Sequence, residues 1–391
     1  MYKLASSTWG SEELKIANEL LSSNNLTMGE NVKEFEKKFA DYIGTNYAVM
    51  FNSGSSANLA ILTALKYVKN SQIQEGDNII VPAVSWSTTY YPISQNGFVL
   101  NFVDINSDTL NIDINKIENA INPKTKAIFA VNLLGNPSSL IELQKIAKRY
   151  DLILLEDNCE SLGASIDSKM TGSFGFASSH SFFFSHHICT MEGGMVSTNS
   201  KELMETLISL RAHGWTRGLE ENNSVYISSG NDWEDLYRFV LPGFNLRPTE
   251  LSGAVGVKQL EKLPMFIQKR RENADLFVSK FKDNKNFKIQ FEVGNSSWFG
   301  FSLILQNKLI GKRKELIKFL SINGIETRPI VAGNFTLNPV MKFLNFLPLP
   351  PLPSADLIHN EGFFIGNHHF DISEELSLVC SLLHDFEIEN T

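Results

Sequence analysis

The chain alternates strand-like and helix-like segments from about residue 10 onward, and this alternation is what most constrains its fold. Apolar runs at 46–51, 78–83, 98–105, 126–135 and 152–157 are typical of strands. Longer amphipathic stretches at 31–44, 55–70 and 139–151 are each long enough for a crossover helix. This order predicts an α/β domain with a mostly parallel sheet. Ligands of such sheets bind near the carboxyl ends of strands, so residues directly after strands are candidates for a site.

The texture of the sequence changes after about residue 240. A long helical run at 243–284 is typical of a connector between domains. It predicts a large domain at 1–258, which includes an N-terminal arm, and a smaller α+β domain at 259–391. A proline-rich stretch at 344–357 favours a covering loop or an extended connector.

Composition excludes several classes of function. The 35 basic and 43 acidic residues give a net charge of −8, and no basic run exists that could neutralise a nucleic-acid backbone. No apolar stretch approaches the roughly 18 residues of a membrane span, and the start of the chain does not resemble a signal peptide. We therefore expect a cytoplasmic protein without nucleic-acid or membrane partners. Cys159, Cys189 and Cys380 are too scattered to predict a disulfide framework or a four-thiolate cluster.

Two strand ends offer polar groups to a ligand. In FNSGSSANLA, a turn with Gly54, Ser55 and Ser56 opens a helix. Free N–H groups at such a helix start can hold a phosphate, although a plain N-cap would look the same. In LILLEDNCESLGA, Asp157 ends an apolar run and could pair with a protonated ring nitrogen of a cofactor. A solvated strand end or a metal ligand remains an alternative reading of that carboxylate.

A third motif, SFFFSHHICTMEGGMVST, contains two adjacent histidines before a Glu-Gly-Gly turn. Neighbouring side chains on an extended backbone point in different directions, so at most one of them is expected to be catalytic. The motif alone leaves open whether that one is His186 or His187.

Together and in this order, the motifs resemble the sugar aminotransferases that depend on pyridoxal 5'-phosphate (PLP). This family has the aspartate-aminotransferase fold (fold type I) and acts on nucleotide-linked keto sugars. GFNLRPTELSGAVG and GIETRPIV extend the resemblance over nearly the whole chain. It implies contacts to the cofactor from Gly54, Ser55, Ser56 and Ser181 at the phosphate, Trp86 on the ring face, Asp157 at the ring nitrogen and Glu160 near the ring hydroxyl, where the family usually has Gln. It also implies that Asn245 reaches the phosphate bound by a partner subunit, and hence a homodimer with shared active sites.

Position 186 departs from the family pattern S-F-x-P-x-K-x4-G-E-G-G. The lysine that links covalently to PLP should come five residues after Ser181 and six before Glu192, and both counts lead to His186. An imidazole cannot form that lasting link, but its unperturbed pKa of about 6.5 suits it to moving protons. A general base therefore replaces a covalent anchor.

Within the family, this replacement resembles the 3-dehydratases of deoxysugar synthesis, which use pyridoxamine 5'-phosphate (PMP). One branch holds an iron–sulfur cluster with cysteines. The other forms the O-antigen sugar colitose from a GDP-linked 4-keto-6-deoxyhexose, needs no cluster and recharges its cofactor from glutamate. Three scattered cysteines favour the second branch. We therefore expect a PLP/PMP enzyme that removes the C3 hydroxyl, takes its amino group from glutamate, and contains no metal.

The resemblance also suggests contacts to the sugar nucleotide. His213 and Arg217 lie in a segment that resembles a loop contributed by the partner subunit, and further candidates are Arg247, Glu326, Arg328 and Asn334. A structural histidine and a polar turn are the alternatives for these positions. Two other functions also remain open: a 4-aminotransferase that uses another amine, and an inactive PLP-binding regulatory protein.

Overall fold

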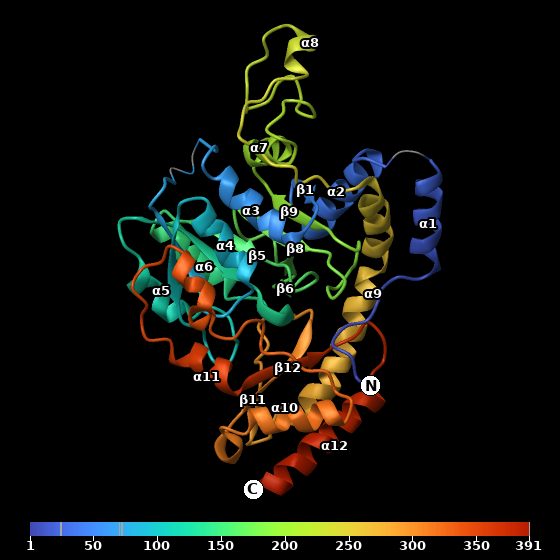
Figure 1. Ribbon diagram of the computed structural model, residues 1–391, viewed down its shortest axis with the longest axis vertical. Helices are drawn as coiled ribbons and strands as arrows, with labels where there is room; N and C mark the ends of the chain where they lie inside the picture. The colour runs from blue at the N-terminus through green and yellow to red at the C-terminus, as the bar shows by residue number, and fades with distance from the viewer. Residues whose placement is uncertain (24–25, 70, 72, 391) are drawn as a thin grey trace.

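The computed structural model describes residues 1–23, 26–69, 71 and 73–390, and its centre is a seven-stranded sheet (Figure 1). In spatial order the strands are β1 (Tyr47–Phe51), β9 (Gly194–Thr198), β8 (Ala177–Ser181), β5 (Ile153–Asp157), β4 (Thr125–Val131), β2 (Asn78–Pro82) and β3 (Val99–Val103). β9 runs antiparallel to both of its neighbours, β1 and β8, and the other neighbouring pairs of this sheet are parallel. The predicted α/β class with a mostly parallel sheet is confirmed.

Alternating strand residues send their side chains into different cores on the two faces of this sheet. In β4, Ala127 and Phe129 join one core, whereas Ile128 and Ala130 join another. Because both faces are covered, the strands are apolar throughout, as parallel strands usually are. Helices that contribute to these two cores include α3 (Gly54–Ala64), α4 (Ser87–Gln95), α5 (Ile114–Ala120), α6 (Leu140–Arg149) and α7 (Lys201–Arg211). A third core, against β1 and β9, includes α2 (Glu30–Ile43).

A second, antiparallel sheet has the order β10 (Phe287–Ile289), β11 (Gly300–Leu305) and β12 (Gly362–Gly366). It shares a core with α10 (Arg313–Ile322), α12 (Ser373–Asn390) and the end of α9 (Glu250–Phe281). Figure 1 shows α9 running from the large sheet down to this smaller unit. The predicted boundary at 258/259 falls inside α9, and it stays a prediction.

The proline-rich stretch is only partly an extended connector. Its last residues begin α11 (Pro353–Glu361), with Pro353 at the first helical position that tolerates proline. Before the helix, the chain follows the edge strand β3, where Leu100 N–H donates to Asn345 O (2.8 Å) and Leu347 N–H donates to Leu100 O (2.9 Å). This segment therefore covers an edge of the large sheet.

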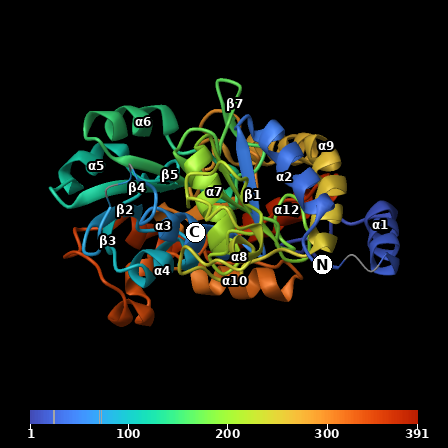
Figure 2. The same ribbon diagram turned by 90° about the horizontal axis from the view of Figure 1, so that it is seen from above.

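Two further segments lie outside the large sheet. The helix α1 (Ser11–Ser22) flanks α9, and a segment that contains the short helix α8 (Asp232–Asp235) projects from the body (Figures 1 and 2). No helix in the described ranges is both long and apolar enough to cross a membrane.

Candidate active site

A cavity of about 340 Å³ lies where β5 and β8 end and α3 begins. It brings together eight residues that the sequence predicts for the site: Gly54, Ser55, Trp86, Asp157, Glu160, Ser181, His186 and Arg328. Lining residues that the motifs do not single out include Ser53, Ser85, Thr88, Cys159, Phe299 and Phe364. The carboxyl ends of the strands thus form the site that their order predicts.

The start of α3 forms a cradle of free N–H groups. The Ser53 hydroxyl oxygen caps the helix by accepting from Ser56 N–H (3.1 Å). The Gly54 and Ser55 N–H groups have no hydrogen-bond partner within the described chain. A Cβ on Gly54 would lie 2.6 Å from Ser181 Cβ, so only glycine lets these two segments approach closely. The Ser56 side chain meets Ser53 instead of lining the cavity.

Asp157 closes β5 and is fixed from three sides. Its Oδ2 accepts from Asn58 Nδ2 (2.9 Å) and from Thr89 Oγ1 (2.8 Å), and its Oδ1 accepts from Cys159 N–H (3.2 Å). Thr89 belongs to α4, the helix that Trp86 caps, and the Trp86 side chain is 56% exposed. One short helix therefore helps to orient the carboxylate and also presents an indole to the cavity.

His186 lies in the loop between β8 and β9, half-buried beside Phe299, with 5.3 Å between the ring centroids. Its Nδ1 is buried and has no hydrogen-bond partner in the described part of the chain. Burial lowers the pKa of His186 to about 4, although a hydrogen bond with the Cys159 backbone acts to raise it. The imidazole is therefore neutral near pH 7 and can accept a proton. His187 is fully buried, and its Nε2 lies 3.1 Å from Ser297 O.

Glu160 is another titratable group with a shifted pKa in this cavity. Its Oε2 accepts from Leu134 N–H (3.0 Å). Burial raises the pKa of Glu160 to about 7, and the charge of Asp157 acts in the same direction. His186 and Glu160 are thus displaced in opposite directions, the pattern that separates a base from an acid.

Arg328 provides positive charge at the cavity. It is exposed, and its guanidinium forms no hydrogen bond or ion pair among the described residues. The other charged lining groups, Asp157, Glu160 and Glu192, are acidic. The guanidinium of Arg328 is therefore available to bind an anionic ligand.

Other predicted residues do not line the cavity of this chain. The Asn334 side chain is buried, where its Nδ2 donates to Asp356 Oδ1 (2.7 Å) and its Oδ1 accepts from Thr336 N–H. Glu326 accepts from Leu4 N–H (3.0 Å). These contacts agree with the alternative reading of that segment as polar turns.

Asn245, His213, Arg217 and Arg247 lie together elsewhere on the chain. A bridge between Ala212 and Asn245 brings their segments side by side, and Asn245 Oδ1 accepts from Arg247 Nε (3.1 Å). None of these four residues lines the cavity of this chain, although Leu246 O accepts from the N–H of Asn52, directly before Ser53 (3.0 Å); their placement against a partner subunit stays a prediction.

The chain belongs to the DegT/DnrJ/EryC1/StrS aminotransferase family, which it matches over residues 8–383. It is 49% identical to GDP-4-keto-6-deoxy-D-mannose 3-dehydratase of Yersinia pseudotuberculosis over 98% of either chain. The structure of the E. coli GDP-4-keto-6-deoxy-D-mannose-3-dehydratase with bound hydrated PLP superimposes with a TM-score of 0.96, at 48% identity over 98% of this chain and 99% of that one. A GDP-4-keto-6-deoxymannose-3-dehydratase structure with a trapped PLP-glutamate geminal diamine gives a TM-score of 0.95, at 48% identity over 98% of this chain and 100% of that one. The family and the PLP aminotransferase fold that the motifs predict are confirmed.

Proposed function

We propose that the protein uses PLP and PMP to remove the C3 hydroxyl from a GDP-linked 4-keto-6-deoxyhexose, with glutamate as amino donor and release of ammonia and 2-oxoglutarate. The observation that carries this proposal is His186, an imidazole at the position of the family's lysine, inside the cavity described above. The three related proteins reported there are named as 3-dehydratases of this kind of sugar nucleotide.

The residues of the cavity fit the cofactor. The Gly54 and Ser55 N–H groups and the Ser181 hydroxyl would hold its phosphate, in a cradle that a Cβ on Gly54 would fill. Asp157 would pair with the ring nitrogen, and the Trp86 indole would cover a ring face. When bound, the cofactor supplies an amine for the sugar ketone and a ring system that takes up electrons.

Two side chains would then handle protons. The imidazole of His186 would accept a proton during the reaction, because its low pKa keeps it neutral near pH 7. Departure of the C3 hydroxyl needs a proton in return. Glu160 can hold it on Oε1, since its Oε2 is occupied by Leu134 N–H. Arg328 would bind a carboxylate or a phosphate of a substrate.

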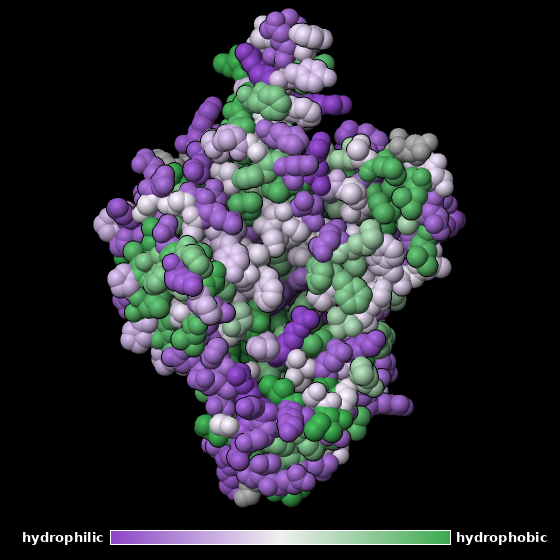
Figure 3. Space-filling model, in the orientation of Figure 1, coloured by the Kyte–Doolittle hydropathy of each residue, from purple (hydrophilic) through white to green (hydrophobic). Residues whose placement is uncertain are grey.

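The active form is proposed to be a homodimer with shared sites. The projecting segment exposes Ile227, Trp233, Tyr237 and Phe239, and Figure 3 shows hydrophobic and hydrophilic groups mixed at its tip. A partner subunit that covered these side chains would also bring Asn245 of one chain toward the phosphate site of the other.

The test is to incubate the purified protein with PLP, glutamate and GDP-4-keto-6-deoxymannose. We expect ammonia, 2-oxoglutarate and a 3-deoxy-4-keto sugar nucleotide. A stable amino sugar without ammonia would instead identify a 4-aminotransferase, and the absence of any product would favour an inactive PLP-binding protein. The role in colitose formation, the cytoplasmic location and the lack of a cluster stay predictions.

A further inference from the structure

The loop that contains His186 has little internal structure. No helix or strand is formed between residues 182 and 193. Three main-chain hydrogen bonds lie inside the loop: His186 N–H donates to Phe183 O, Thr190 N–H to Phe182 O, and Phe182 N–H to Gly193 O (each 2.9 Å). Thr190 Oγ1 also donates to Glu192 O (3.0 Å), and Met191 N–H to Cys189 Sγ (3.3 Å). A segment with so few bonds of its own depends on outside contacts for a fixed position.

Cys189, three residues after His186, supplies the main-chain groups for two such contacts. Its N–H donates to Gln259 Oε1 (3.0 Å), and its carbonyl oxygen accepts from Trp9 Nε1 (2.8 Å). Gln259 belongs to α9, whereas Trp9 belongs to the N-terminal arm, which we define as residues 1–10. Because Cys189 is only 4% exposed, water cannot readily replace either partner.

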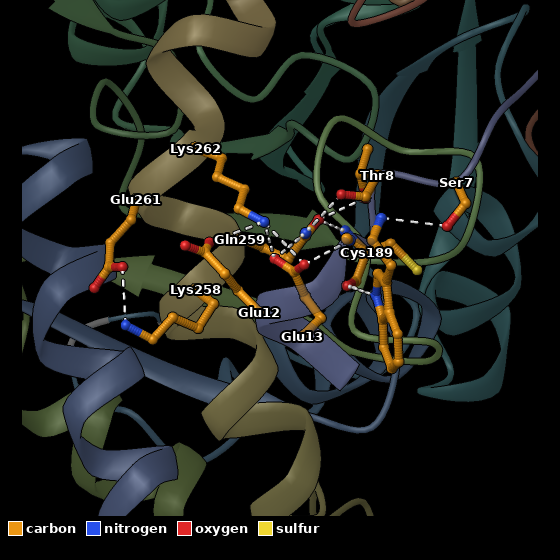
Figure 4. Close-up of polar contacts among 11 residues, drawn as sticks. Ser7, Thr8, Glu12, Glu13, Cys189, Lys258, Gln259, Glu261 and Lys262 are labelled. Carbon is orange, nitrogen blue, oxygen red and sulfur yellow. Dashed lines mark hydrogen bonds and ion pairs between the residues drawn. The ribbon is translucent and has the colours of Figure 1, made fainter. Parts of the chain in front are cut away.

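Gln259 joins the loop, the arm and α9 through a single amide (Figure 4). Besides Cys189 N–H, its Oε1 accepts from Thr8 Oγ1 (2.5 Å). Its Nε2 donates to Thr8 O (3.1 Å) and to Glu13 Oε1 (2.9 Å). A primary amide can form four hydrogen bonds of this kind, and Gln259 forms all four while fully buried. Glu13 is in turn held by Lys262 (2.8 Å).

The other end of the arm contacts the smaller unit. Tyr2 OH donates to Gly366 O (2.6 Å), and Ser6 Oγ lies 2.9 Å from His368 Nδ1. The arm therefore extends from the second sheet to the loop of His186. Ser6 contacts the smaller unit and Trp9 contacts the loop of His186, so each contact can be removed by its own substitution.

We propose that the N-terminal arm is a positioning element of the active site: Trp9 and Gln259 hold the backbone of Cys189 and thereby fix the loop that places His186 against the cavity. The expected effect on turnover rests on the proposed function. The expected effect on the position of the loop does not. Displacement of a reacting group by about 1 Å can lower a rate roughly 100-fold, so a loosened loop should slow turnover more than it weakens binding.

The test compares Trp9→Phe and Gln259→Met with wild type, each saturated with PLP. Trp9→Phe keeps an aromatic ring, although a smaller one, and removes the N–H donor to Cys189 O. Hydrogen exchange of the peptide 182–193, measured by mass spectrometry, should become roughly fivefold faster in either variant. The kcat for dehydration should fall roughly tenfold or more, with KM for glutamate and sugar changed less than about twofold.

Ser6→Ala is the matched control, because it removes a hydrogen bond of the same arm without touching the loop. It should change neither the exchange of 182–193 nor kcat. Unchanged exchange in Trp9→Phe would overturn the proposal, even if Gln259→Met failed to fold. Faster exchange with unchanged kcat would show that the contact is only structural. A wild type that shows no dehydration but the expected exchange pattern would refute the proposed function and leave the loop contact standing.

Discussion

Burial in the cavity shifts the pKa values of a histidine and a glutamate in opposite directions. The pKa of His186 falls to about 4 and that of Glu160 rises to about 7. Between these values the imidazole is neutral and the carboxyl group is protonated. An enzyme that needs a base and an acid at once should therefore work best in that interval.

The pH dependence follows from the same two residues. kcat/KM should rise as the pH passes about 4, where His186 loses its proton, and fall as it passes about 7, where Glu160 loses its own. Glu160→Gln keeps a neutral side chain but cannot give up a proton, so kcat/KM should be lower at every pH and the fall near pH 7 should disappear. Glu192→Gln, another lining residue, should keep it. An unchanged alkaline limb in Glu160→Gln would exclude Glu160 as the acid.

His186→Lys exchanges a base for an amine that can link to the cofactor. Dehydration should fall by roughly 10²- to 10⁴-fold, the usual contribution of a general base. Bound PLP should become covalently attached, which is measured as a mass increase after borohydride reduction. His186→Gln separates the two effects, because it should lose activity without gaining the link. Dehydration at the wild-type rate in His186→Lys would mean that another group is the base.

Sequence reasoning located residues at fixed distances within a motif and missed those that packing brings in. The spacing from Ser181 and Glu192 in the family pattern predicts His186, and the end of an apolar run predicts Asp157. Phe299 lies in the smaller unit, and nothing local to it indicates that it contacts His186. Ser56 is a predicted cofactor contact, but its side chain hydrogen-bonds with the capping residue Ser53. The sequence does not distinguish these cases, because a serine at a helix start can either bind a ligand or take part in the cap.

At the scale of elements, strand positions were predicted more accurately than their ends. The apolar run 126–135 continues past β4, which stops at Val131. Leu134 then adopts a left-handed backbone conformation (φ 53°), and its N–H donates to Glu160 Oε2. Hydropathy cannot show this turn, because leucine is apolar in a strand and in a bend alike. Helix α3 likewise ends at Ala64, short of the predicted residue 70.

The cap of α3 offers a test of the phosphate cradle. Ser53→Ala removes the oxygen that accepts from Ser56 N–H, and should lower the free energy of unfolding by about 1 kcal/mol. It should also weaken PLP binding, measured by equilibrium dialysis, because the cradle N–H groups lose their fixed direction. Ser200→Ala removes an equivalent cap on α7, far from the cavity lining. Equal loss of PLP affinity in both variants would show that only general stability was affected.

The whole molecule presents a cavity that both units line, the smaller one with Phe299 and Phe364, and a set of predicted site residues that lie outside this lining. Asn245 and Arg217 are exposed, and the projecting segment near them exposes several large apolar side chains. Aromatic groups exposed together often mark a protein interface. A two-fold dimer would cover them on both chains at once, since such an interface uses the same patch twice.

Mixed dimers measure whether the sites are shared. His186→Gln should inactivate the cavity of its own chain, whereas Asn245→Asp should inactivate the cavity of its partner by placing a negative charge near the phosphate. In a dimer with one copy of each variant, one site then contains both defects and the other contains neither. Random reassortment of equal amounts makes about half of the dimers mixed, so about a quarter of wild-type activity should return from two inactive preparations. If Asn245 served its own chain, every site in the mixture would contain one defect, and no activity would return.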